Sequence, residues 1–209
     1  MSRLSRGLTA LAALLLLTVY ALPLWRIALR APQYPEGIGM RIRVSTVEGI
    51  KPQDLDNLNA LNHYIGMKPI HADAIPELRV MPWLVAGLAV FGLAAAVVGR
   101  RKLLAAWLAA FLALGVAGLA DFYRWAWDYG HDLDPEAIIR VPGMSYTPPI
   151  LGTKVLLNFT ATSRPDAGAI ACGVAFALGA AALWMSRRRR PATLATAPAP
   201  RAAGLAAAL

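Results

Sequence analysis

Three histidines and two methionines are the residues of this sequence best suited to chemistry. His63, Met67 and His71 follow one another at intervals of four residues, and His131 and Met144 lie in a second polar stretch. Imidazole nitrogen and thioether sulfur suit a soft or borderline cation, copper best among the common ones. A glycine and a proline fall inside the first group, so we do not expect one continuous helix to present all three residues. The pattern gives a copper-binding hypothesis, with ordinary polar and packing roles as the alternative.

Four long apolar segments, which we call blocks, flank the loops that contain these residues. The chain has 209 residues, of which 57% are hydrophobic and 16% are charged, and its mean hydropathy is +0.49. An ordinary soluble domain is about 45–50% apolar and about 25% charged. Each block holds close to the roughly 20 residues that a helix needs to cross a bilayer, and its interior contains no charge. We therefore expect four transmembrane helices, over residues 7–25, 81–99, 103–120 and 167–185.

Charged residues are distributed unevenly between the ends of these blocks. Residues 1–6, 100–102 and 186–209 contain Arg and Lys but no acid, whereas all twelve acidic residues lie within 26–80 and 121–166. The positive-inside rule then places both termini in the cytoplasm of a bacterial inner membrane, with two outer loops. The first apolar run is longer than that of a signal peptide, so we expect it to be retained, and the C-terminal tail to be disordered. The net charge of +9 is attributed to these anchoring clusters and the lipid surface, not to nucleic-acid binding.

The two outer loops are expected to form one small folded cap. Residues 40–44 alternate apolar and polar side chains, which is typical of a strand, and residues 155–159 repeat this pattern. Apolar residues recur at helical spacing over 55–65, and Gly66 is suited to end that helix. We predict that the two strands pair. The expected fold class is an all-α membrane protein, with four transmembrane helices and a small α+β extracytoplasmic cap formed by the two loops.

Several classes of function receive no support from the sequence. The four apolar blocks contain no ionisable group of the kind that transporters and proton pumps use. All three histidines lie outside these blocks, so the sequence gives no pair of membrane-embedded haem ligands. There is no nucleophile and base motif, no phosphate-binding loop and no zinc spacing. We therefore expect a protein that is not an enzyme; no cofactor is established by the sequence, and copper is the candidate.

Two strings in the outer loops carry a resemblance to a known family. They are Leu61-Asn-His-Tyr-Ile-Gly-Met67 in the first loop, and Pro142-Gly-Met-Ser-Tyr-Thr-Pro-Pro-Ile-Leu-Gly152 followed by Leu156-Leu-Asn-Phe159 in the second. Over roughly residues 55–165, the chain resembles small bacterial membrane proteins that are encoded beside nitrous-oxide reductase and its copper-delivery factors. The resemblance implies an accessory role in maturing or supporting a periplasmic copper enzyme. It favours copper over other metals and assigns no catalytic residue.

Three functions follow from this sequence as hypotheses. The first is a non-enzymatic accessory protein whose cap handles copper or docks a copper enzyme or its assembly factors. The second is a structural or scaffold subunit of a respiratory complex that has no metal site. The third is electron transfer from quinol through the aromatic run 122–129 and His131, which lacks a recognisable cofactor site. All three hypotheses predict that the chain contacts membrane lipid and has no nucleic-acid partner.

Overall fold

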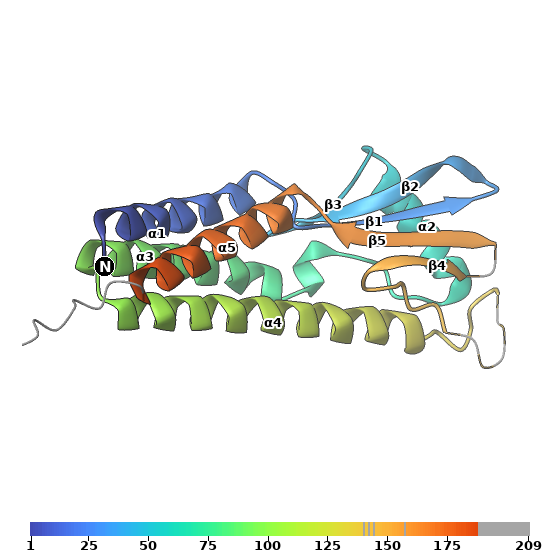
Figure 1. The fold of residues 1–209 in the computed structure, drawn as a ribbon. Helices are drawn as coiled ribbons and strands as arrows, with labels where there is room; N and C mark the ends of the chain where they lie inside the picture. The colour runs from blue at the N-terminus through green and yellow to red at the C-terminus, as the bar shows by residue number, and fades with distance from the viewer. Residues whose placement is uncertain (140, 142, 144, 157, 188–209) are drawn as a thin grey trace, which may run out of the picture.

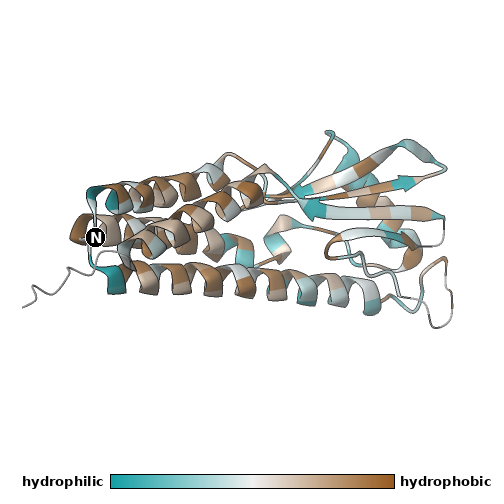
Figure 2. Cartoon of the chain, in the orientation of Figure 1, coloured by the Kyte–Doolittle hydropathy of each residue, from teal (hydrophilic) through white to brown (hydrophobic). Residues whose placement is uncertain are grey.

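The computed structural model describes residues 1–187 except 140, 142, 144 and 157. It divides into a bundle of helices at one end and a sheet domain at the other (Figure 1). Four helices are long and apolar enough to cross a membrane. They are α1 (Arg3–Leu15) with the 3-10 turn η1 (Leu16–Tyr20), α3 (Glu77–Val98), α4 (Arg101–His131) and α5 (Ala167–Arg187). Figure 2 shows hydrophobic residues along the whole bundle, which agrees with the four apolar blocks of the sequence.

The centre of the bundle is the side chain of Trp107 on α4. Trp107 is fully buried, and its indole Nε1 donates a hydrogen bond to the carbonyl of Leu88 (2.8 Å). Two glycines on neighbouring helices make room for the ring, because a Cβ at Gly92 or Gly179 would lie only 2.7–2.8 Å from it. Small residues at such contacts let helix backbones approach closely, which is the usual basis of helix association in lipid.

Helix α4 is longer than a membrane span requires. Its 31 residues correspond to about 46 Å, whereas about 20 residues cross the hydrocarbon core. The excess continues as helix beneath the sheet domain, where Phe122, Trp125 and Tyr129 pack on the core of that domain (Figure 1). The sequence predicts an outer loop from residue 121. The structure instead has helix to His131, where Phe122, Trp125 and Tyr129 are half-buried against the sheet domain while Tyr123 and Trp127 stay exposed.

The sheet domain contains five strands in the order β3-β2-β1-β5-β4, and every neighbouring pair is antiparallel. The strands are β1 (Trp25–Ala31), β2 (Tyr34–Ile42), β3 (Val47–Gly49), β4 (Gly152–Leu156) and β5 (Phe159–Pro165). About three-fifths of the described residues are helical, so the description all-α is too narrow and applies only to the bundle.

The predicted pairing of residues 41–44 with 155–159 is wrong. Strand β1 lies between β2 and β5, and the second predicted strand is divided into the hairpin of β4 and β5. Strand β1 is not predicted from the sequence because it starts at Trp25, directly after an apolar run that conceals its alternation. Its position at the centre of the sheet comes from pairing with two segments far away in sequence.

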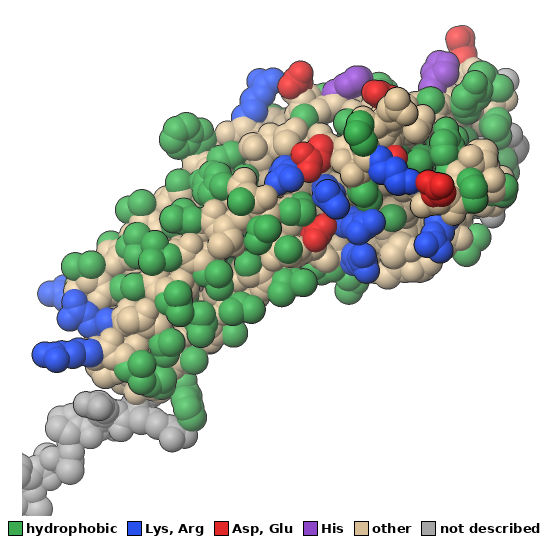
Figure 3. Space-filling view, turned by 90° about the horizontal axis from the view of Figure 1, so that it is seen from above, with side chains coloured by type: hydrophobic (Ala, Val, Ile, Leu, Met, Phe, Trp, Pro, Cys, Tyr) green, Lys and Arg blue, Asp and Glu red, His purple; other side chains and the backbone are tan. Residues whose placement is uncertain are grey.

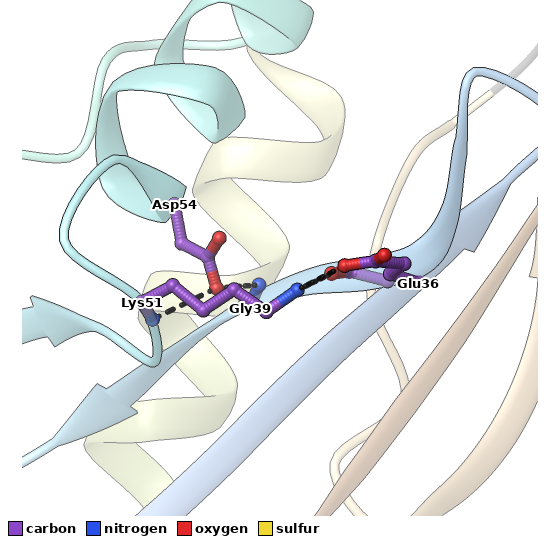
Figure 4. Close-up of polar contacts among 5 residues, drawn as sticks. Glu36, Gly39, Lys51 and Asp54 are labelled. Atoms are coloured by element: carbon purple, nitrogen blue, oxygen red, sulfur yellow. Dashed lines mark hydrogen bonds and ion pairs between the residues drawn. The ribbon is translucent and has the colours of Figure 1, made fainter.

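Helix α2 (Asp54–Ile65) covers one face of this sheet, where the apolar stripe predicts a helix. Its first residue, Asp54, is only 3% exposed. One carboxylate oxygen of Asp54 accepts hydrogen bonds from the backbone N–H groups of Gly39 on β2 (3.0 Å) and Lys51 (3.1 Å) (Figure 4). The helix ends at Gly66, whose φ of 77° is the left-handed conformation that glycine adopts without strain.

Candidate functional site

The C-terminal ends of α2 and α4 meet at a contact that we call the α2–α4 junction, formed by residues 63–71 and 127–139. The N–H of Asp134 donates to the Gly66 carbonyl (2.8 Å), and the N–H of Ile139 donates to the Tyr64 carbonyl (2.9 Å). The Tyr129 hydroxyl also donates to a carbonyl in the first segment, that of Pro69 (3.3 Å). The junction therefore brings together the two loops that contain the predicted ligands.

An ion pair between Lys68 and Asp132 adds to this junction. The hydrogen bond from Lys68 to the Asp132 carboxylate raises the pKa of the lysine above its ordinary value. Both side chains are largely exposed, so we assign the pair a role in alignment and little contribution to stability.

His131 is the predicted ligand whose ring orientation is best defined. Its imidazole stacks on Trp127 with ring centroids 3.6 Å apart. The ring nitrogen Nδ1 lies 3.0 Å from the Trp127 carbonyl and 3.1 Å from the Thr147 hydroxyl. The carbonyl only accepts, so the tautomer with the proton on Nδ1 donates to it and has its lone pair on Nε2, whereas the other tautomer accepts from the Thr147 hydroxyl. A histidine whose other N–H is held by a carbonyl is the usual form of a metal ligand.

The remaining predicted ligands point in different directions. His63 and His71 are exposed, and the nearest aromatic neighbour of His63 is the ring of Tyr64 at 6.2 Å. Met67 is half-buried and lines a cavity beneath the junction. Met144 lies outside the described residues. Among the described part of the chain, no three His, Cys, Asp or Glu side chains are grouped to hold a metal ion. The five-residue copper set remains a prediction.

The cavity beneath the junction has a volume of about 80 Å³ and is almost entirely apolar. It lies between the inner face of the sheet, α2 and the end of α4, and its lining includes Met40, Met67, Trp125, Tyr129, Tyr146 and Phe159. Two polar atoms in this lining, Trp125 Nε1 and the Tyr146 hydroxyl, are buried and have no hydrogen-bond partner in the described structure. Such groups are unusual in protein interiors. A small, mainly apolar molecule with a hydrogen-bond acceptor would suit this cavity.

Sequence reasoning missed this cavity, although one signal for it was present. Trp125 and Tyr129 are four residues apart and their rings lie 4.2 Å apart, which is the spacing of one helix face. That spacing indicates that the helix continues beyond the apolar block. Nothing local marks Tyr146, since its 4% exposure results from packing against segments distant in sequence.

Comparison of the sequence with models of known protein families and with curated proteins found no match. The similarity of the two loop strings to a family associated with nitrous-oxide reductase therefore stays a prediction. The functional interpretation depends on the charges and contacts of the chain itself.

Proposed function

We propose that this chain is a non-enzymatic accessory protein of the bacterial inner membrane, whose sheet domain handles copper for a periplasmic copper enzyme. The nitrous-oxide reductase system is the partner that the sequence resemblance implies. The observation that carries the proposal is the geometry of His131, whose Nδ1 lies 3.0 Å from a backbone carbonyl; in the tautomer that donates to this carbonyl, Nε2 is left to bind a soft cation. Residues close to this histidine in sequence, Tyr129 and Asp134, hydrogen-bond to the segment that contains Met67, which supports the proposal that the two segments share one site.

The proposed orientation draws support from the end of the bundle remote from the sheet. The amino group of Met1 donates to the Gly99 carbonyl (3.0 Å), and Arg6 Nε donates to the Ala96 carbonyl (2.8 Å). Both cations lie at the C-terminal end of α3, where they complement the helix dipole. Lys and Arg side chains gather at this end of the molecule (Figure 3). A cytoplasmic location for this end satisfies the positive-inside rule.

Copper retention by the purified full-length protein tests the metal assignment. The protein in detergent is loaded with Cu(I) under reducing conditions and desalted, and copper is measured by elemental analysis. We expect about one copper per chain, because imidazole and thioether ligands from both segments of the junction would make a single low-coordinate site. The double variant His63→Ala/Met67→Ala and the single variant His131→Ala should each lose most of it. Met81→Leu, a methionine change in the bundle, is the control and should retain copper.

Equal copper retention in the His131 variant and in the control would disprove the ligand assignment. Circular dichroism and size-exclusion profiles of each variant separate loss of metal from loss of fold. Absence of copper from the unaltered protein would favour the scaffold function below.

A scaffold subunit without a metal site is the second candidate, and the far end of the sheet domain favours it. Ile138, Leu151 and Val155 are each about two-thirds exposed (67–68%). Val155 belongs to β4, an edge strand of the sheet. Exposed apolar side chains beside an open strand edge are typical of protein-binding surfaces. If this end docks a partner, a tagged chain should recover that partner from native membranes, and Val155→Lys should reduce recovery more than Ala60→Lys on α2.

A further inference from the structure

The face of the sheet opposite α2 carries three arginines side by side, which we call the arginine row. Arg26 on the central strand β1 is in register with Arg41 on β2 and with Arg164 on β5. Residues directly opposite each other on paired strands project from the same face, so the three guanidinium groups share one surface. Figure 3 shows Lys and Arg side chains in the middle of the molecule, with Asp and Glu side chains among them.

The charge of this row is not neutralised within the described structure. Glu48 on β3 is the residue opposite Arg41, but its carboxylate pairs with Arg43 instead (2.7 Å). No carboxylate among the described residues forms an ion pair with Arg26, Arg41 or Arg164. Like charges directly opposite on neighbouring strands repel each other, so the arrangement is unfavourable unless an anion is bound.

Two atoms of the row are also without a hydrogen-bond partner. The Nε atoms of Arg26 and Arg41 are buried, and neither donates a hydrogen bond in the described structure. A buried N–H of a charged group without an acceptor is costly. An oxyanion placed across the row would accept from both, since guanidinium groups match the geometry of phosphate and carboxylate oxygens.

The position of the row indicates where that oxyanion comes from. Arg164 lies three residues before α5 begins at Ala167, and Arg26 lies six residues after η1 ends at Tyr20. Three strand residues span about 10 Å, and the headgroup region extends about 5–8 Å from the hydrocarbon core, so Arg164 lies near the outer edge of that region. The next positions away from the helices on the same face are small, Ala28, Gly39 and Thr162, so no large side chain covers the arginines from that direction.

We propose that the arginine row binds the phosphate group of an anionic phospholipid in the leaflet next to the sheet domain. The bound phosphate neutralises the row and satisfies the two Nε atoms. It thereby holds the base of the sheet at the membrane surface. This proposal requires that the four apolar helices span the membrane, and it does not depend on copper binding or on the identity of a protein partner.

Native mass spectrometry of the full-length protein in detergent tests the proposal. Graded dioleoylphosphatidylglycerol is added to the unaltered protein and to Arg26→Gln/Arg41→Gln, Arg164→Gln and Arg30→Gln. Arg30 is the matched control, because it lies on the same strand and face but at the end away from the bundle. We expect lipid affinity to fall about twenty-fivefold in the double variant and about fivefold in Arg164→Gln, taking about fivefold per arginine. Arg30→Gln should change it less than twofold.

A second arm distinguishes a lipid headgroup from a free anion. The same titration is repeated with zwitterionic dioleoylphosphatidylcholine and with a large molar excess of inorganic phosphate as competitor. Weaker binding of the zwitterionic lipid and no displacement by phosphate are the results expected of a lipid site. Full displacement by inorganic phosphate would overturn the lipid assignment. Unchanged phosphatidylglycerol binding in both Arg164→Gln and the double variant would overturn the site itself, and Arg164 is exposed, so its replacement leaves the fold intact.

Discussion

The carboxylate of Asp54 should be the main polar attachment of α2 to the sheet, and two substitutions separate its hydrogen bonds from its charge. One oxygen accepts from the buried N–H of Gly39 and from the partly buried N–H of Lys51. Asp54→Ala leaves both donors without a partner, which costs about 1–3 kcal/mol for the first and about 1 kcal/mol for the second. The expected loss of unfolding free energy is therefore about 2–4 kcal/mol. Asp54→Asn keeps one acceptor oxygen without the charge and should lose about half as much.

Hydrogen–deuterium exchange of the full-length protein in detergent measures this effect locally. A loss of about 2.8 kcal/mol makes exchange about one hundredfold faster in peptides covering 37–42 and 54–65, while the bundle helices stay unchanged. Asp56→Ala is the matched control, since Asp56 lies in the same first turn but is exposed. The reasoning is refuted if Asp56→Ala is as damaging as Asp54→Ala, or if Asp54→Asn is no milder than Asp54→Ala.

The other structural predictions concern the bundle and the cavity. Gly92→Ala places a Cβ 2.8 Å from the indole of Trp107 and should lower the thermal stability in detergent by about 1–3 kcal/mol, as overpacking does. Gly115→Ala on α4, where nothing lies within 4 Å, should leave the thermal stability unchanged or slightly raised. Equal melting temperatures of the Gly92→Ala and Gly115→Ala proteins would contradict this account of the Trp107 contact. Tyr146→Phe removes a buried hydroxyl without a partner, so the melting temperature should stay the same or rise by the equivalent of up to about 1 kcal/mol. A fall in the melting temperature of Tyr146→Phe would show that the hydroxyl has a partner in solution.

The candidate site shows what local sequence patterns can and cannot predict. The spacing of His63, Met67 and His71 predicts a common ligand set, yet Met67 turns into the cavity while both histidines face outward. Side-chain direction after the end of α2 depends on the left-handed turn at Gly66 and on contacts with α4. Such contacts join residues about 70 positions apart in sequence, and no local periodicity encodes them.

The sequence by itself determined the four membrane-compatible helices, because a long apolar block leaves its backbone no alternative to helix in lipid. Tertiary structure determined which strands of the sheet pair with one another. Strand β1 has little local signal of its own and becomes a central strand because β2 and β5 supply its hydrogen-bond partners. The same pairing aligned Arg26, Arg41 and Arg164, which are scattered in the sequence. Strand register is a relation between distant segments, so only the folded chain shows which charges stand together.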